Sequence, residues 1–235
     1  MKTLVSLISL LAILLVALPG PLYKYGVVEL FTAFGALRYG VYVGIAALVL
    51  LLIQIIFMRK NISWPAAGVS ALLAIIAIGL PVSMMMKGKS VPPIHDISTD
   101  LINPPDFVAI VPLRADAPNP AEYAGEETAK QQREAYPELT TQKYQQSSEQ
   151  LFDAAELVVK ELGWEVVKST KSLGLIEATD TTAWFGFKDD VVIRISDSGE
   201  QRFLDVRSKS RVGRSDLGKN AERIHTLIDG INKKL

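Results

Sequence analysis

A basic cluster near the C-terminus contains the residue types that are best suited to bind an anion. Residues 205–223 hold six Lys or Arg side chains and three Asp or Glu side chains. They surround the expected start of the last helix, where free backbone N–H groups and the helix dipole attract negative charge. The sequence therefore predicts a site for an anionic ligand or a partner. Its candidate residues are Arg194, Asp205, Arg207, Ser208, Ser210, Arg211, Arg214, Asp216 and Asn220.

A structural role for the same cluster is the alternative. In that case Ser215 or Asp216 caps the last helix, because Ser and Asp side chains accept hydrogen bonds from the free N–H groups. The arginines then pair with Asp189, Asp190 or Glu177. The sequence leaves both alternatives open.

Other candidate chemistry has less support. The adjacent carboxylates of Asp189 and Asp190 suit acid–base or metal chemistry, but such a pair before a strand is also typical of a turn or an arginine partner. His95, Asp96 and Asp100 make only a sparse ligand group for a metal. The sequence has no cysteine, which excludes disulfides and thiolate sites. It also has no nucleophile elbow, P-loop or dinucleotide motif, so we expect no catalytic residue, metal or cofactor.

Charge and hydropathy divide the chain near Met86. Residues 1–92 carry seven Lys or Arg and one Glu, a balance of +6. Residues 93–235 carry eighteen Lys or Arg and twenty-four Asp or Glu, a balance of −6. The long apolar runs lie in the first part. Because a net acidic soluble part repels the phosphate backbone, no nucleic-acid partner is expected.

The first part, residues 1–90, predicts a membrane anchor. A helix of roughly 20 apolar residues crosses a bilayer core. The candidate spans are residues 3–18, 39–58 and 64–86, and residues 23–38 are expected in the interface as a short helix or an irregular loop. The first run also fits a secretory signal peptide, and this alternative stays open.

The orientation follows from the positive-inside rule, although the charges near the spans almost balance. The tight Arg59-Lys60 loop favours a cytoplasmic N-terminus. Three spans then put the C-terminal part outside the cytoplasm, which predicts a multi-pass protein of a bacterial inner membrane with a periplasmic domain.

Small residues recur on the second and third spans. Gly40 and Gly44 form a Gly-x-x-x-Gly pair, and a stripe of small residues runs from Gly68 to Ala77. Small residues let helices approach closely in lipid. The two stripes either pack within one chain or recruit another subunit.

The C-terminal part predicts an α+β fold. Residues 91–141 are rich in proline and are expected to form linker and loop. Residues 142–235 show the periodicity of a helix, four strands and a final helix. Short connections favour a four-stranded antiparallel sheet with both helices on one face.

Alternation along the strands assigns their side chains to the two faces of this sheet. Arg194, Asp205 and Arg207 are expected on the face away from the helices, with Glu177 as a companion. Cross-strand pairs of this kind form either a structural ladder of ion pairs or a polar recognition surface.

Several long motifs resemble the domain of unknown function 1499 (DUF1499) family of bacteria and plastids, over about residues 93–231. The motifs are IHDISTD at residues 94–100, PPDF at 104–107, AYPEL at 135–139, GLIEATDTTAWFGFKDDVVIRI at 174–195 and DVRSKSRVGRSDLGKNAERI at 205–224. The resemblance implies a domain of envelope and chloroplast proteins for which no reaction is established.

These observations together predict a membrane-anchored envelope protein without enzymatic activity. Its extracytoplasmic domain is expected to bind a protein partner or to help assemble a membrane complex. The alternatives are a hydrolase that acts on an envelope anion and a carrier of lipid or another small ligand. An open cleft where acids and arginines converge would favour the hydrolase, whereas a closed network of ion pairs would disfavour it.

Overall fold

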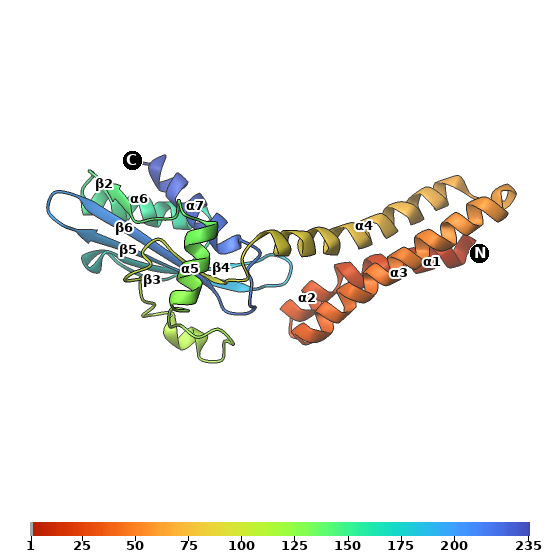
Figure 1. Cartoon of the computed structure of the whole chain (residues 1–235), viewed down its shortest axis with the longest axis horizontal. Coiled ribbons are helices and arrows are strands. Elements are labelled where there is room, and N and C mark those ends of the chain that lie inside the picture. Colours follow the sequence, from red (N-terminus) through yellow and green to blue (C-terminus); the bar gives the residue numbers. More distant parts are fainter. Residues whose placement is uncertain (1) are drawn as a thin grey trace. The chain divides into compact units, whose positions relative to one another are not determined.

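The computed structural model describes residues 2–235, except for the side chain of Lys2 (Figure 1). It divides into two compact units. The first unit extends to Lys87 and includes the short segment 183–186. The second unit contains residues 88–182 and 187–235. Each unit is described by itself below.

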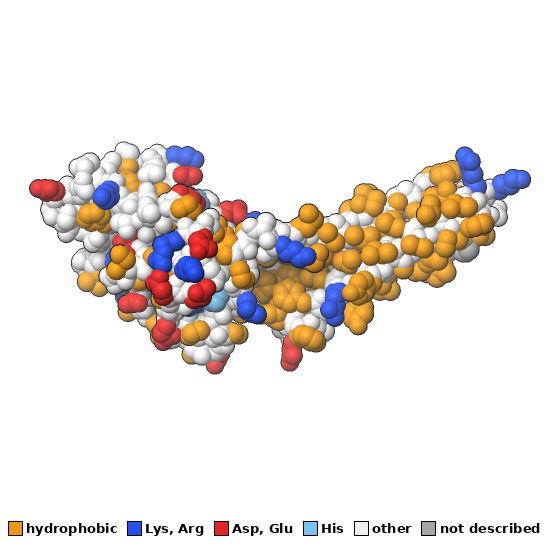
Figure 2. Space-filling model, viewed as in Figure 1, with side chains coloured by type: hydrophobic (Ala, Val, Ile, Leu, Met, Phe, Trp, Pro, Cys, Tyr) orange, Lys and Arg blue, Asp and Glu red, His pale blue; other side chains and the backbone are white. Residues whose placement is uncertain are grey.

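Four helices make up most of the first unit. They are α1 (Lys2–Ala17), α2 (Pro19–Lys24), α3 (Leu30–Phe57) and α4 (Trp64–Ser90), and a short turn, η1 (Arg59–Asn61), joins the last two. Three stretches are long and apolar enough to cross a membrane, namely Thr3–Lys24, Leu30–Phe57 and Trp64–Ser90. Apolar side chains cover these helices along their length (Figure 2). The predicted set of three apolar helices is confirmed. Residues 30–38, which were expected to belong to a separate interfacial segment, instead form the first turns of α3.

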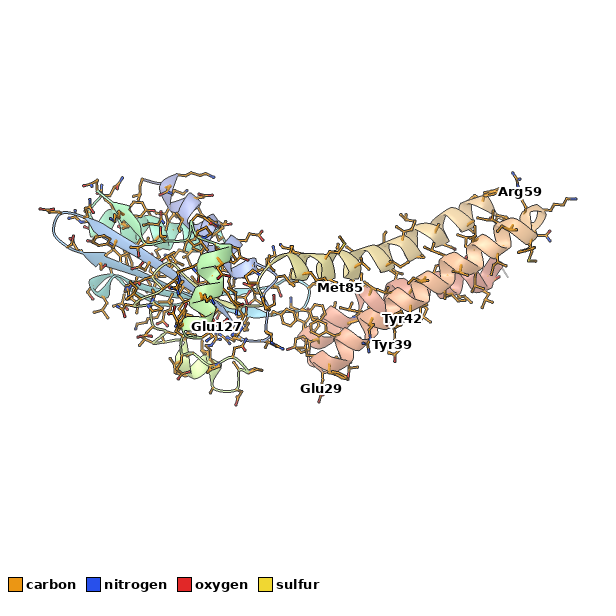
Figure 3. The ribbon with its side chains drawn as sticks, in the orientation of Figure 1. Glu29, Tyr39, Tyr42, Arg59, Met85 and Glu127 are labelled. Atoms are coloured by element: carbon orange, nitrogen blue, oxygen red, sulfur yellow. The ribbon has the colours of Figure 1, made fainter. Side chains whose placement is uncertain are left out.

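Glycines bring α3 into close contact with both neighbouring helices. A Cβ on Gly40 would lie 2.7 Å from Val16 of α1, and one on Gly44 would lie 3.0 Å from Ile78 of α4. On the same stretch of α3, the rings of Tyr39 and Tyr42 make an edge contact at 6.3 Å (Figure 3). The Gly-x-x-x-Gly pair therefore packs against two helices of the same chain, and only Gly44 meets the helix that carries the second stripe.

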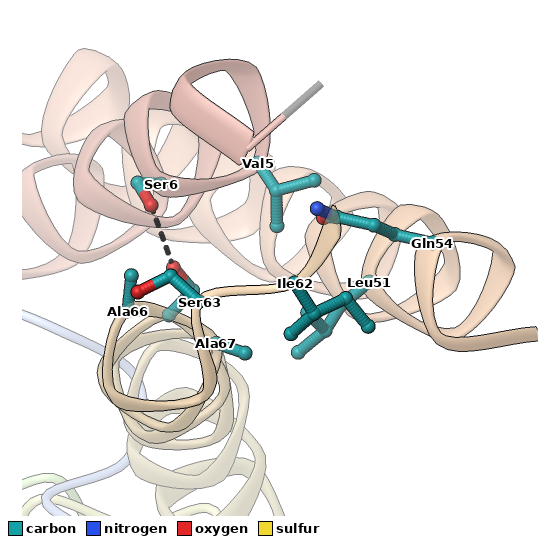
Figure 4. Close-up of a pocket in the computed structure, with 9 residues that line it drawn as sticks. Val5, Ser6, Leu51, Gln54, Ile62, Ser63, Ala66 and Ala67 are labelled. Atoms are coloured by element: carbon teal, nitrogen blue, oxygen red, sulfur yellow. Dashed lines mark hydrogen bonds between the residues drawn. The ribbon is translucent and has the colours of Figure 1, made fainter. Parts of the chain in front are cut away.

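A polar contact joins α1 and α4 near the turn η1. The hydroxyls of Ser6 and Ser70 are hydrogen-bonded at 3.0 Å, beside a cavity of about 10 Å³ (Figure 4). The side chain of Gln54 on α3 also lines this cavity. Polar side chains from three helices, Ser6, Gln54 and Ser70, therefore line the same small cavity.

The segment 183–186 contributes an aromatic cluster to the first unit. The buried ring of Phe185 lies 6.0 Å from that of Tyr23 and 5.6 Å from that of Phe34. The indole of Trp184 packs so closely on Gly20 that a Cβ there would lie 2.6 Å from it. A glycine is therefore required at position 20.

The second unit is built around one antiparallel sheet. In chain order its elements are β1 (Asp96–Ser98), η2 (Val111–Arg114), α5 (Glu126–Ala135), β2 (Gln142–Tyr144), α6 (Ser148–Glu161), β3 (Glu165–Thr170), η3 (Lys171–Leu173), β4 (Leu175–Thr181), β5 (Lys188–Asp197), β6 (Arg202–Ser210) and α7 (Lys219–Asn232). The strand order is β1-β6-β5-β4-β3, and β2 also pairs with β6.

The predicted α+β class is confirmed, but the sheet has six strands instead of four. The four predicted strands are β3 to β6. The two others, β1 and β2, are only three residues long and pair with different halves of β6. Such short strands show no alternation in the sequence, because alternation needs at least four residues to be recognised.

Two helices cover one face of the sheet, as predicted, and lie side by side in Figure 1. Helix α6 starts with a capping box, in which Ser147 and Gln150 exchange hydrogen bonds. Helix α7 begins at Lys219. Apolar side chains of α6, α7 and the sheet form one buried core, which includes Leu151, Ile176, Ile193, Leu204, Ile224 and Ile231.

The opposite face of the sheet is covered by the segment between β1 and α5. Phe107 and Ile110 of this segment pack on Val192 of β5, and all three side chains are buried. Residues that were expected to form linker and loop therefore form the second cover of the sheet. This cover determines the surroundings of the predicted site.

We expect Ile224→Asp to unfold the second unit, because Ile224 is fully buried between α7 and the sheet. An unpaired carboxylate there costs more than about 3 kcal/mol, a large part of the stability of a typical domain. Limited proteolysis of the full chain in mild detergent measures the loss. Thr226→Asp, on the exposed side of the same helix, is the control and should leave the cleavage pattern unchanged. Equal protection of both variants would contradict the assignment of the helix face.

Candidate functional site

The predicted site lies on β5, β6 and the segment that leads into α7. Arg194 of β5 lies opposite Asp205 of β6. Val192 of β5 lies between Arg207 of β6 and Glu177 of β4. These four charged side chains occupy the face away from the helices, as the alternation predicts. The face is not open to solvent, because the segment from β1 to α5 covers it.

The centre of the site is a buried cluster of one acid and two bases. The carboxylate of Asp96 accepts from Nε and Nη2 of Arg207, both at 2.9 Å, and lies 3.1 Å from Nζ of Lys209. The side chains of Asp96 and Arg207 are fully buried. Burial lowers the pKa of Lys209, and the nearby Asp96 opposes this shift. Two cations therefore share one carboxylate in the interior.

Backbone carbonyls and aromatic rings compensate the excess positive charge of this cluster. Arg207 donates to the carbonyl oxygens of Pro105 and Ala121, at 3.3 and 2.9 Å. Its guanidinium lies 4.8 Å from the centre of the Phe107 ring and 5.3 Å from that of Tyr123, which favours a cation. Burial and the nearby Asp96 raise the pKa of Tyr123 to about 12, so this phenol stays neutral at physiological pH.

A second cluster forms around Asp190. Its carboxylate accepts from Arg114 at 2.6 Å, from Thr179 at 2.7 Å, and from both Nε and Nη2 of Arg211 at 2.8 Å. Arg114 also donates to the carbonyl oxygens of residues 119, 209 and 210. Burial lowers the pKa of Arg114, and Asp190 opposes the shift. The arrangement joins η2, β5 and the end of β6.

A third cluster forms on the other face, around Arg223 of α7. Its guanidinium contacts Asp189 at 2.6 Å and Asp180 at 2.8 Å, and it donates to the amide oxygen of Asn220 at 2.7 Å. The side chain of Asn220 also contacts the hydroxyls of Ser208 and Ser210, at 2.6 and 3.0 Å. The polar residues before α7 are therefore hydrogen-bonded to one another.

The N-terminus of α7 is already occupied by a carboxylate of the chain. Asp216 accepts from the backbone N–H groups of Gly218 and Asn220, at 2.8 and 2.7 Å. Burial raises the pKa of Asp216, and these two hydrogen bonds oppose the shift. Asp216 therefore satisfies N–H groups at the start of α7, as in the structural alternative, although the N-cap position itself is occupied by Gly218.

Two further charged residues of the sheet, Glu177 and Arg194, hold the covering segment in place. Glu177 accepts from the backbone N–H groups of Val108, Ala109 and Ile110, at 2.7 to 3.2 Å. On β5, Arg194 bridges Asp100 and Asp205 at 2.9 and 3.0 Å. The covering segment is thus fixed to the sheet by charged groups at several points.

The geometry separates the two carboxylates that the sequence places side by side. Asp189 and Asp190 are neighbours on β5, so their side chains point to opposite faces. Asp189 pairs with Arg223 and Asp190 with Arg114 and Arg211. The two acids therefore cannot act on one substrate. Among residues 2–235 no group of three or more His, Asp or Glu is placed to hold a metal ion.

The candidate residues are thus divided between the two faces of the sheet, with Arg194, Asp205 and Arg207 on one and Ser208, Ser210 and Asn220 on the other. One candidate belongs to none of the clusters. Arg214 is exposed, and its guanidinium has no hydrogen bond or ion pair within the described residues. Conversely, Arg114 and Asp180 belong to the clusters although they were not among the candidates. Nothing in the local sequence marks them, because their partners are 76 and 43 positions away.

A family profile described as protein of unknown function (DUF1499) matches residues 96–231. This range is more than half of the chain. The chain belongs to the DUF1499 family. Comparison with proteins of curated function finds no match.

The DUF1499 match begins and ends at structurally meaningful positions. Its first residue, Asp96, is the acid of the central cluster, and its last, Ile231, is a fully buried residue of α7. The covering segment therefore belongs to the DUF1499 domain together with the sheet and helices. A domain cut at residue 142 would leave Arg207 and Lys209 without their carboxylate.

Two arginines in the DUF1499 motif should respond differently to truncation. Arg211→Ala removes two hydrogen bonds from the buried carboxylate of Asp190, and we expect a loss of about 2–4 kcal/mol in the free energy of unfolding. Arg214→Ala removes an exposed side chain and should change it by less than about 0.5 kcal/mol. Thermal melts of both variants of the full chain provide the comparison. Equal melting temperatures would show that the Asp190 cluster does not stabilise the domain.

Proposed function

We propose that this DUF1499 protein is a multi-pass protein of a bacterial inner membrane, without enzymatic activity. Its C-terminal domain lies in the periplasm, where it binds a protein partner or helps to assemble a membrane complex. The proposal combines three supports: the apolar helices, the charge around them, and an exposed apolar segment on the DUF1499 domain.

The apolar helices support the membrane location. Only 28% of the most apolar stretch of α3 and 17% of that of α4 are buried within the described structure. Large side chains such as Leu72, Ile75 and Leu80 are more than half exposed. An apolar surface of this extent is unfavourable in water and is expected to be covered by lipid or by other helices.

The charged turn between α3 and α4 supports the orientation. Arg59 and Lys60 lie in η1, at the end of two long apolar helices. Positive charges in short loops favour the cytoplasmic side. With η1 in the cytoplasm, the one span that follows it, α4, puts the DUF1499 domain on the periplasmic side.

Partner binding rests on one observation: the covering segment exposes four large apolar side chains. Their exposed fractions are 98% for Ile102, 64% for Val108, 45% for Val111 and 52% for Leu113. Exposed apolar side chains that occur singly are ordinary, but a series on one short segment is typical of an interaction surface.

The backbone beneath these side chains is held rigidly. Asp100 accepts from the N–H of Ile102 at 3.0 Å, and Glu177 accepts from the N–H of Val108 at 2.8 Å. Arg114, at the end of η2, is buried and paired with Asp190. Because the segment is already ordered, a partner would not have to supply the free energy of ordering it.

The charge around the segment indicates what kind of partner would fit. Asp106 and Asp116 are exposed beside the apolar side chains, and the part of the chain after residue 92 carries a balance of −6. An apolar protein surface with a basic rim would be complementary in both respects.

The two other functions have less support. A hydrolase would need a carboxylate or arginine free to act on substrate, but the candidate acids are paired in closed clusters. A lipid carrier would need an apolar cavity between the sheet and its helices. Leu151, Ile176 and Ile224 fill this interior and are fully buried.

The partner surface can be tested by a double variant, Ile102→Ser with Val108→Ser. Both side chains are exposed, so we expect an unchanged melting temperature but at least about tenfold weaker co-purification of the partner, since each lost apolar contact contributes about 1 kcal/mol. A photo-reactive residue at position 111 would capture the partner in cells. Leu173→Ser is the control, because Leu173 is 71% exposed on the separate turn η3. Undiminished capture by the double variant would contradict the proposed surface.

The orientation can be tested with reporters fused after Leu235. We expect alkaline phosphatase to be active there, because it folds only in an oxidising compartment, and a cytoplasmic fluorescent reporter to be dark. A second fusion between Arg59 and Lys60 should show the opposite pattern. Phosphatase activity confined to the second fusion would reverse the orientation.

A further inference from the structure

Basic side chains mark the same end of each apolar segment in the first unit. Lys24 ends α2, Arg38 lies in the first half of α3, and Lys87 lies in the last turn of α4. Among residues 2–87 and 183–186, Glu29 is the single acidic residue. Glu29 lies at this same end, directly before α3, so the three basic side chains leave it with a balance of +2.

The length of α3 determines where Arg38 lies in a membrane, given the anchoring proposed above. The helix has 28 residues, or about 42 Å at a rise of about 1.5 Å per residue, whereas the hydrocarbon core is about 30 Å thick. The charged turn η1 keeps the other end at one boundary. Counting back from Phe57, a helix of about 30 Å reaches Arg38, which places its guanidinium at the level of the opposite headgroups.

Aromatic side chains surround Arg38 on the outer surface of α3. Phe34 and Tyr42 lie one turn before and one turn after it on the same face of the helix, and Tyr39 adjoins it. The exposed fractions of these three side chains are 48%, 56% and 61%. Figure 3 shows Tyr39 and Tyr42 close together on α3, far from Arg59 at the other end of the helix. Tyrosine rings favour the headgroup level of a bilayer.

Arg38 itself is available for a ligand. Its side chain is exposed, and no hydrogen bond or ion pair joins it to any other residue within the described range 2–235. This distinguishes it from Lys24, which donates to the carbonyl oxygen of Ala183 at 3.1 Å. An unpaired guanidinium at headgroup depth lies where phosphate groups are the most abundant anions.

We infer that Arg38, together with Tyr39 and Tyr42, binds the phosphate of an anionic phospholipid headgroup. The guanidinium can donate two parallel hydrogen bonds to a phosphate, and the phenol hydroxyls are further donors. The excess positive charge at this end favours a lipid with net negative charge over a zwitterionic one, whose own ammonium group competes for its phosphate. The inference deepens the proposed membrane anchoring and rests on it.

The test uses the full chain in nanodiscs made of equal amounts of phosphatidylglycerol and phosphatidylethanolamine. Lipids that stay bound after release into mild detergent are identified by native mass spectrometry. We expect the parent chain to retain phosphatidylglycerol preferentially. Arg38→Gln should lower this preference about tenfold, the effect of losing one charged hydrogen-bonded contact. Arg38→Lys keeps the charge but loses the paired geometry and should give an intermediate value.

Arg59→Gln is the matched control. Arg59 is also exposed, lies at the other end of α3 and has no tyrosine within one turn. The Arg59→Gln variant should retain the phosphatidylglycerol preference of the parent chain. An equal loss of the phosphatidylglycerol preference in Arg38→Gln and Arg59→Gln would show general charge attraction and overturn the inference. An unchanged preference in Arg38→Gln would also overturn it. Release of the parent chain from membranes by alkaline carbonate would instead overturn the anchoring, and the inference with it.

Discussion

The buried pair of Asp96 and Arg207 is the interaction on which the rest of the DUF1499 domain depends. Both side chains are fully buried, and a charge in that position costs several kcal/mol unless its partner and hydrogen bonds are present. The two residues are 111 positions apart, so neither is satisfied until β1 pairs with β6. That pairing carries the covering segment across the sheet, where its carbonyl groups and the rings of Phe107 and Tyr123 complete the surroundings of Arg207.

The other clusters extend the same constraint to the rest of the domain. Asp190 joins the sheet to η2 through Arg114, and Asp189 joins it to α7 through Arg223. Buried ion pairs often contribute little net stability compared with apolar residues of similar size, but removing one partner is costly. Such clusters therefore favour one arrangement over its competitors. They also pair each of these acids with a cation of the same domain.

The sequence predicts those features of the domain that depend on local patterns. Alternation assigned Arg194, Asp205 and Arg207 to the correct face, and the apolar periodicity identified α6 and α7 as the cover of the other one. Two features of the domain could not be predicted from local patterns in the sequence. Strands of three residues, such as β1, have no readable period. The identity of ion-pair partners depends on the complete fold. The spacing of Asp96 from His95 and Asp100 made it a weak candidate for a metal ligand, whereas the pairing of β1 with β6 makes it the partner of Arg207.

The motifs by which this chain resembles its family are largely the residues of these clusters. In the motif at residues 205–224, Arg207, Lys209, Arg211 and Arg223 all pair with buried acids. A shared motif of this kind specifies architecture, because each member is needed to satisfy a charge elsewhere. Residues that can meet another molecule must instead be exposed and unpaired. On the DUF1499 domain they include the apolar side chains of the covering segment, such as Ile102 and Val108, which lie between the motifs. Functional differences among proteins with this fold are therefore expected at exposed positions of the covering segment, such as Ile102 and Val108, and on the apolar helices, because substitution there removes no partner of a buried charge.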